Sequence, residues 1–267
     1  MSEEQSQNEQ PQQQQSSGSS SAGDQPPRAR GLEALKTHIL EHKVETALWA
    51  TRALTLLFCI SYLIPVFGNP YNSYQKVLMS NAATSALRLN QRIPSVQFSR
   101  EFFVQLLMED SAHYLLYSLI FMYTSPMTMV LAPIFLFALL HFASYSLGLL
   151  DIIGQNSALG SRFLISLVEY HHRNILRGAA FVEIFLMPHC ILSLLIGRGS
   201  LITPFAYYRF LTLRYSSRRN PYTRNMFLEL RVTSEHLANS PSTPTFLRNA
   251  IFRAITFISG LAPAVSQ

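Results

Sequence analysis

The sequence of 267 residues has few charged side chains and almost no cysteine. Charged residues make up 13% of the chain, whereas about a quarter is typical of soluble domains. The two cysteines, Cys59 and Cys190, lie inside apolar stretches, so nothing supports a disulfide framework or a cysteine-based zinc site. Hydrophobic residues make up 48% of the chain instead, and this composition indicates a membrane protein.

The sequence also lacks the motifs of several common catalytic sites. It contains no G-x-S-x-G, no phosphate-binding loop and no H-E-x-x-H. His38 and His42 lie one helical turn apart, but their spacing provides no third metal ligand. We therefore predict that the protein is not an enzyme and has no catalytic residue, no metal site and no cofactor.

Long apolar runs set the fold class. Tyr114–Leu150 contains no Asp, Glu, Lys or Arg, and a run of more than ~18 such residues is typical of a membrane span. As one helix it would be ~55 Å long, against a hydrocarbon core of ~30 Å, so it must tilt or fold back, with Ser125-Pro126 as the natural hinge. We predict an all-α, polytopic membrane protein with three to four transmembrane helices, at about 47–67, 102–123, 126–150 and 178–196.

The remaining segments are polar or basic. Residues 1–30 are rich in Gln and Ser, which predicts a disordered tail. The basic connection 69–100 contains an amphipathic helix that we expect to lie on a surface. We predict a helical membrane domain over 31–200, followed by a basic cytosolic region over 201–267.

Four ionisable residues fall in or near the apolar segments: Arg52, Glu109, Asp110 and Glu183. Each such group at depth costs ~2.5–3.5 kcal/mol even on the most lenient insertion scale, so it should face a partner or water. Arg52 is one candidate partner for the acids. We favour the interior of the helix bundle for these residues over a proton or ion path.

A basic cluster follows the last apolar segment in the sequence YYRFLTLRYSSRRNPYTR, residues 207–224. Basic residues next to a span gain ~1 kcal/mol each near anionic lipid, and tyrosine prefers the headgroup level. Arginine in place of lysine indicates bidentate contacts, either with lipid phosphates or with acids of the bundle. We predict membrane or partner binding rather than nucleic-acid binding, by Tyr207, Tyr208, Arg209, Arg214, Tyr215, Arg218, Arg219 and Arg224.

A second amphipathic helix is predicted at about 244–262. At 100° per residue, its apolar side chains share one face, and Asn249 and Thr256 lie opposite. This helix is suited to the membrane interface or to packing on the bundle. The face that would make either contact comprises Leu247, Ile251, Ile255 and Ile258.

Positive charge marks the cytosolic side of a membrane, which places the carboxyl end in the cytosol. With four crossings the amino end is cytosolic too, and the basic loop 69–100 is lumenal, against the rule. With three crossings that loop is cytosolic and the amino end is lumenal. The charges leave both arrangements open.

Four stretches together resemble the transmembrane protein 33 family of endoplasmic-reticulum and nuclear-envelope membrane proteins. They are ATSALRLNQRIP (83–94), EDSAHYLLYSLIF (109–121), EIFLMP (183–188) and PFAYYRFLTLRYSSRRNPYTR (204–224), within a similarity from about Val44 to Val265.

This resemblance implies a non-enzymatic, multi-pass protein of the endoplasmic-reticulum membrane and nuclear envelope. It implies a role in organising tubular membrane with reticulon-type curvature proteins and, in some members, nuclear-pore components. Anionic lipid of the cytosolic leaflet is a further expected partner, and self-association is compatible with this reading. The alternatives are a channel or transporter component and a regulator of membrane stress signalling.

Overall fold

The structure is a computed structural model that describes residues 31–64, 68–93, 99–154 and 159–263. The predicted disordered tail, 1–30, lies outside these ranges. Helices account for all the regular structure that the described residues form. The helices are α1 (Leu32–Glu41), α2 (Lys43–Leu63), α3 (Pro70–Arg92), α4 (Arg100–Met108), α5 (Asp110–Met122), α6 (Thr128–Ile153), α7 (Leu159–Ile165), the π-helical turn η2 (Ser166–Tyr170), α8 (His172–Leu195), α9 (Ile202–Ser216), α10 (Tyr222–Asn239) and α11 (Thr245–Gly260).

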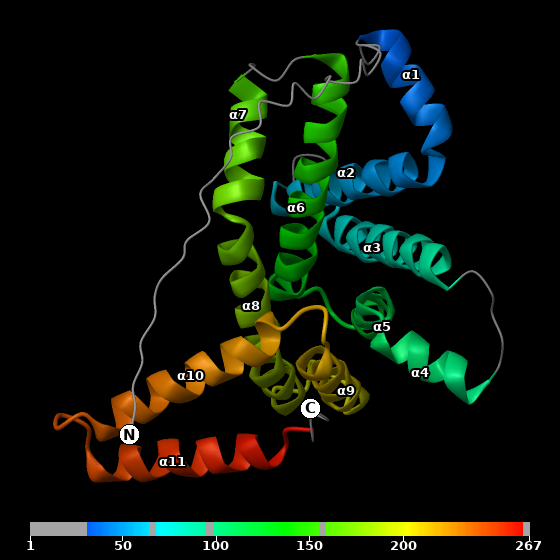
Figure 1. Cartoon of the computed structure of the whole chain (residues 1–267). Helices are drawn as coiled ribbons and strands as arrows, with labels where there is room; N and C mark the ends of the chain where they lie inside the picture. Colours follow the sequence, from blue (N-terminus) through cyan, green and yellow to red (C-terminus); the bar gives the residue numbers. More distant parts are fainter. Residues whose placement is uncertain (1–30, 65–67, 94–98, 155–158, 264–267) are drawn as a thin grey trace, which may run out of the picture.

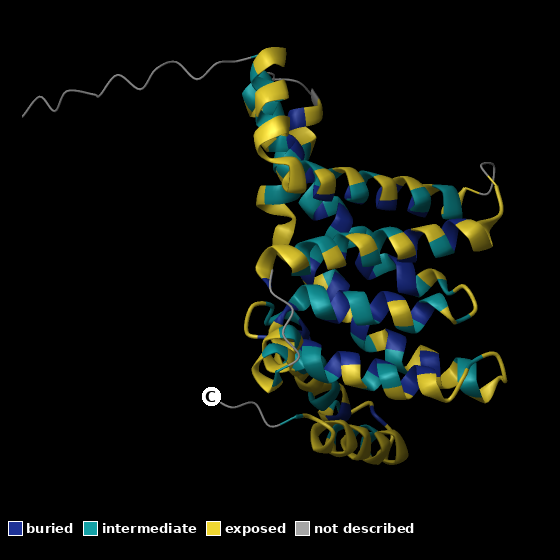
Figure 2. Cartoon of the chain, turned by 90° about the vertical axis from the view of Figure 1, so that its right-hand side faces the viewer, coloured by how far each residue is buried: buried dark blue, intermediate teal, exposed yellow. Residues whose placement is uncertain are grey.

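The helices form two crossing groups (Figure 1). In one group α2, α3, α5 and α9 are stacked in that order, and Figure 2 shows them one below another. In the other group α6 packs against α8 and runs across the stack, where it contacts α2 and α3. α10 packs on α8, and α11 packs on α10 at the edge of the molecule.

Three described helices are long and apolar enough to cross a membrane: α2, α6 and α8. They cover most of the predicted spans 47–67, 126–150 and 178–196 and confirm an all-α, polytopic architecture. Residues 102–123 differ from the expected single span, because they form α4 and α5, of 9 and 13 residues. Neither helix reaches the ~20 residues that a crossing requires.

Local sequence explains where several helices begin and end. The Asn69 side chain accepts a hydrogen bond from the backbone N–H of Tyr71, and Pro70 occupies the first turn of α3, where no N–H is needed. The Ser99 hydroxyl caps α4 in the same way. α6 ends at Gly154, whose φ of 84° is a left-handed conformation that favours glycine.

An aromatic core holds the stack together. Tyr117 and Phe121 of α5 and Tyr207 and Phe210 of α9 are fully buried, with ring centroids 5.0 Å apart for Tyr117 and Phe210. The phenol of Tyr117 donates to the carbonyl oxygen of Val130 in α6, 2.8 Å away. Aromatic pairs at this separation add ~0.5–1.5 kcal/mol each beyond the area that they bury.

α3 is an interior helix, which corrects the expectation that it lies on a surface. It sits between α2 and α5, and its Tyr74, Val77 and Leu78 are fully buried. Hydroxyl pairs join it to α2 along its length: Ser61 with Ser73 at 3.1 Å, Thr55 with Ser80 at 2.8 Å, and Thr51 with Thr84 at 2.9 Å. Small hydroxyl residues of this kind bring helices close in apolar surroundings, so the polar sequence of α3 is compatible with burial.

Candidate functional site: a buried ion-pair network

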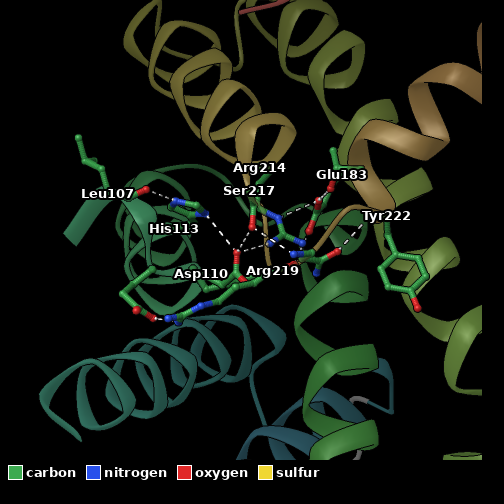
Figure 3. Close-up of polar contacts among 12 residues, drawn as sticks. Leu107, Asp110, His113, Glu183, Arg214, Ser217, Arg219 and Tyr222 are labelled. Carbon is green, nitrogen blue, oxygen red and sulfur yellow. Dashed lines mark hydrogen bonds and ion pairs between the residues drawn. The ribbon is translucent and has the colours of Figure 1, made fainter. Parts of the chain in front are cut away.

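A buried ion pair between Arg214 of α9 and Glu183 of α8 forms the centre of the site (Figure 3). Nε of Arg214 lies 3.2 Å from Oε2 of Glu183, and the two residues are 1% and 0% exposed. Removing two charges from water is expensive unless further hydrogen bonds compensate for the lost hydration. The surroundings of both residues supply those bonds.

Glu183 accepts hydrogen bonds at both carboxylate oxygens. The Tyr114 hydroxyl of α5 donates to Oε1, and the Thr223 hydroxyl at the start of α10 donates to Oε2 at 3.0 Å. The backbone carbonyl of Glu183 accepts a further bond from the Tyr207 hydroxyl at 2.7 Å. One turn of α8 therefore joins α5, α9 and α10 through a single residue.

Arg214 also pairs with Asp110 at the start of α5. Its NH1 donates to Oδ1 of Asp110 at 3.2 Å, and the Ser217 hydroxyl donates to the same oxygen at 2.8 Å. The guanidinium lies 5.3 Å from the ring centroid of Tyr114 and 5.9 Å from that of Phe137. Burial by itself lowers the pKa of Arg214, but the electrostatic effects of Glu183, Tyr114 and Asp110, with the hydrogen bond to Glu183, together outweigh it and raise the pKa above its ordinary value.

Glu109 lies at the break between α4 and α5, and it pairs with one arginine of α3 and one of the segment after α9. NH1 of Arg92, near the end of α3, lies 2.6 Å from its Oε2, and NH1 of Arg219 lies 2.5 Å from the same atom. The backbone of Glu109 is extended, with φ −90° and ψ 122°, so it interrupts the helix there. The carboxylate is buried although both arginines are partly exposed, which places this pair at the edge of the network.

His113 of α5 is the remaining ionisable group at the site. Its Nε2 donates to the carbonyl oxygen of Leu107 at 2.7 Å, while its Nδ1 is enclosed without a hydrogen bond and lies 3.7 Å from Oδ1 of Asp110 (Figure 3). Burial lowers the pKa of His113 and the charge of Arg214 adds to this effect, against the Leu107 hydrogen bond and Asp110. The imidazole is therefore held neutral.

The network balances its charges. Its three carboxylates, on Glu109, Asp110 and Glu183, each contact at least one of the three arginines Arg92, Arg214 and Arg219. Such an arrangement fixes α3, α5, α8, α9 and the start of α10 relative to one another. Within the described ranges no three His, Cys, Asp or Glu side chains are grouped as metal ligands.

The structure divides the residues that were predicted to bind membrane or partner. Arg214 and Tyr207 are buried inside the protein, so neither faces lipid. The acids of α5 and α8 need counter-charges, and Arg214 supplies one. Tyr208 and Tyr215 are half-buried, bonded to the Leu261 carbonyl and packed on Phe227 respectively, and the exposed members are Arg209, Arg218, Arg219 and Arg224.

Arg52 is not the partner of the acids. It is 8% exposed on α2, whereas the acids pair with arginines of α3, of α9 and of the segment after α9. The sequence correctly indicates that Glu109, Asp110 and Glu183 need partners. Sequence reasoning did not identify four other members of the network as site residues, and only their positions close to predicted residues could have indicated them: Arg92, Tyr114, Ser217 and Thr223.

The helix predicted at 244–262 is present as α11, and none of its residues is buried. The predicted apolar face is therefore only partly covered: Ile251 and Ile255 are half-buried, whereas Leu247 and Ile258 remain 39% and 50% exposed.

Comparison with known proteins assigns the chain to a family. Residues 27–264 match the family described as "Transmembrane protein 33/Nucleoporin POM33". The chain belongs to this family. Transmembrane protein 33 of Rattus norvegicus is 48% identical over 230 residues, which cover 85% of this chain and 93% of that protein. Krueppel homolog 2 of Drosophila melanogaster is 45% identical over 264 residues, 90% of this chain and 95% of that protein. No solved structure matches the chain.

The transmembrane protein 33 assignment confirms the resemblance drawn from the four sequence stretches. The fold brings residues of all four stretches into the ion-pair network: Arg92, Glu109, Glu183 and Arg214 come from one stretch each. In this protein, the four sequence stretches that carry the resemblance each contribute a residue to the same network.

Proposed function

We propose that this protein is a non-enzymatic membrane scaffold of the endoplasmic reticulum and nuclear envelope. In this proposal it organises tubular membrane and nuclear-pore structure through contacts with lipid and with curvature-generating proteins of the reticulon type. Membership of a family named after a transmembrane protein and a nucleoporin supports this assignment. The observation that carries it is the exposed apolar surface of α11.

α11 makes its helix contacts with α10, at the edge of the molecule (Figure 1), and several of its large apolar residues are exposed. Phe246 and Phe257 are 75% and 68% exposed, and Ile258 is 50% exposed. A helix of this kind gains free energy by inserting its apolar side at the boundary between headgroups and acyl chains. Insertion into one leaflet expands that leaflet and favours a curved membrane.

Exposed arginines near α11 fit an anionic surface. Arg209 lies on α9, Arg218 follows it and Arg224 lies in the first turn of α10, whereas Arg219 is engaged by Glu109. Each basic side chain near an anionic leaflet contributes ~1 kcal/mol of attraction. The proposed units are a membrane domain over 31–200 and a cytosolic region over 201–267 that holds these arginines and α11.

The crossing of the two helix groups supports the same function. α2 runs across α6 and α8 (Figure 1), so the three helices do not stand parallel to one another. When the α6–α8 pair is upright in the bilayer, α2 is strongly tilted, and its exposed Leu54, Leu57 and Leu63 face lipid.

The network of paired acids weighs against the transport alternative. A pathway for ions or protons needs charged groups that exchange partners with water, and Glu183 is fully buried and held by Arg214, Tyr114 and Thr223. We expect no flux from the reconstituted protein. A current that Glu183→Gln abolishes would favour the transport function instead.

The test of the scaffold uses the full chain reconstituted in vesicles of phosphatidylcholine with phosphatidylserine. We expect the wild-type protein to draw out tubules visible by electron cryo-microscopy. The variant Leu247→Asp/Ile258→Asp places two charges on the exposed apolar face, and it should lose tubulation while remaining inserted.

The matched control is Asn249→Asp/Thr256→Asp. It adds the same charge to the opposite, polar face of α11, and both positions are exposed. Tubulation by this control at the wild-type level is expected. Equal tubulation by both variants would remove α11 from the proposed function. In cells, the tagged chain should label the reticulum tubules and the nuclear rim.

A further inference from the structure

α2, α3 and α6 pack together (Figure 1), and Arg52, Arg88 and His141 lie close in sequence to contacts that join them. These contacts are the hydrogen bond from Thr84 to Thr51 and the stacking of Trp49 on Phe142. NH1 of Arg88 in α3 lies 3.4 Å from Nε2 of His141 in α6. A guanidinium can only donate, so Nε2 accepts and His141 is a neutral imidazole in this contact. The positive charges of Arg52 and Arg88 act on each other, and both act on His141.

Arg52 has no partner for its charge among the residues that the structure describes. It is 8% exposed, yet none of them accepts a hydrogen bond from it or forms an ion pair with it. The only fully enclosed side-chain nitrogen without a bond in the described ranges is Nδ1 of His113. The guanidinium nitrogens of Arg52 are therefore not completely enclosed.

The acids of the protein do not neutralise this pair. Glu109, Asp110 and Glu183 are engaged by Arg92, Arg214 and Arg219, and Asp110 acts on Arg88 only at longer range. Burial, followed by the positive charge of Arg92, lowers the pKa of Arg88, as expected for a cation that lacks a close counter-charge. Two positive charges thus remain uncompensated.

We propose that Arg52, Arg88 and His141 form a binding site for an anionic phosphate group. Uncompensated arginine on a helix able to cross a membrane is costly, and a bound anion removes that cost. The planar guanidinium matches the oxygens of phosphate in a bidentate way, and it is less strongly hydrated than an ammonium group. The phosphate can come from an anionic lipid headgroup or from a free phosphate ion.

The test measures thermal unfolding of the full chain in neutral detergent. Trp49, the only tryptophan, is stacked on Phe142 at 5.6 Å between centroids, one turn from Arg52, and reports on this junction by fluorescence. The additions are inorganic phosphate, dioleoylphosphatidic acid and, as a zwitterionic control, dioleoylphosphatidylcholine, all at equal ionic strength. We expect inorganic phosphate, phosphatidic acid or both to raise the Tm, because a ligand that binds the folded state stabilises it. Phosphatidylcholine should leave the Tm unchanged.

A shift with inorganic phosphate identifies a free-anion site, and a shift with phosphatidic acid alone identifies a headgroup site. The variant Arg52→Gln/Arg88→Gln should weaken the apparent affinity about tenfold or more, because it removes charge-assisted hydrogen bonds. Without any anion, its Tm should equal or exceed that of the wild type, since the repulsion is gone. The control Arg100→Gln/Arg173→Gln removes the same charge from two exposed positions outside the proposed lipid-binding arginines and should keep the shift.

Four results would overturn the site. They are no shift with either anion, an equal shift with phosphatidylcholine, an equal loss in the surface control, and a double variant that unfolds more easily than the wild type without anion. The last result would mean that the arginines stabilise the fold by contacts within the chain. None of these results bears on tubulation by α11, which is tested separately.

Discussion

Replacing Arg214 by glutamine should destabilise the protein strongly. The change removes the positive charge that faces both Glu183 and Asp110 and leaves the Glu183 carboxylate without its ion-pair partner at a position that is 0% exposed. Breaking one side of a buried ion pair costs ~3–5 kcal/mol, because the remaining charge is neither hydrated nor paired.

Local hydrogen bonds reduce this cost somewhat. Glu183 keeps the donated bonds of Tyr114 and Thr223, and Asp110 keeps that of Ser217. Asp110 is also 29% exposed at its side chain, so water can replace the arginine there. We therefore expect the free energy of unfolding to fall by ~3–4 kcal/mol, most of it from Glu183.

The assay is equilibrium unfolding in detergent with urea, followed by circular dichroism and by the fluorescence of Trp49. Arg209→Gln is the matched control, since Arg209 is an exposed arginine of the same helix, and its change should stay within ~0.5 kcal/mol. Arg214→Lys keeps the charge but loses the bidentate geometry, so it should fall between the two.

A double-mutant cycle with Glu183→Gln decides the reasoning. If the pair is truly desolvated, the double variant should be little worse than either single variant, with a coupling of ~2–3 kcal/mol. A loss below ~1 kcal/mol for Arg214→Gln, with helix content retained, would show that the network is hydrated and does not hold the bundle.

Three further predictions follow from the structure. The pKa of His113 lies below the ordinary 6.5 in the folded protein, so protonation favours the unfolded chain. The free energy of unfolding should therefore fall as the pH drops below about 6.5. In the variant His113→Gln, unfolding measured across this pH range should show a smaller fall. Tyr207→Phe removes the buried bond to a backbone carbonyl and should cost ~1 kcal/mol in urea unfolding, whereas Tyr123→Phe, at an 88% exposed position, should cost nothing measurable. Single cysteines at Gly160 and Ser216, at the opposite ends of α7–α8–α9, should react with an impermeant maleimide from opposite sides of sealed vesicles, and labelling from one side would contradict a crossing by α8.

Composition and hydropathy were sufficient to predict much of the fold. The apolar runs predicted α2, α6 and α8 because a membrane span needs only length and hydrophobicity. The apolar periodicity of residues 244–262 predicted α11 for a similarly local reason. α3 was predicted to lie on a surface because its hydroxyl and amide side chains read as solvent-facing. In the fold the same hydroxyls, such as Thr84 and Ser80, bond across to α2.

The partners within the site could not be predicted from the sequence. Arg214 and Asp110 are 104 residues apart, and no local pattern specifies which arginine faces which acid. Arg52 is nearer in sequence to Asp110 than Arg214 is, and it falls in an apolar run, so it was a reasonable candidate. The packing of α9 against α5 decides otherwise, and the aromatic contacts in that packing join residues far apart in the sequence.

The order in which the network is completed has a consequence for biogenesis. Glu183 is translated before Arg214, so for part of synthesis its carboxylate has been committed to the apolar region without a cation. A chain that stops short of α9 stays in that condition permanently. In such truncated products the unpaired carboxylate of Glu183 would be a feature that membrane quality control can recognise, whereas in the finished polypeptide Arg214 pairs with it.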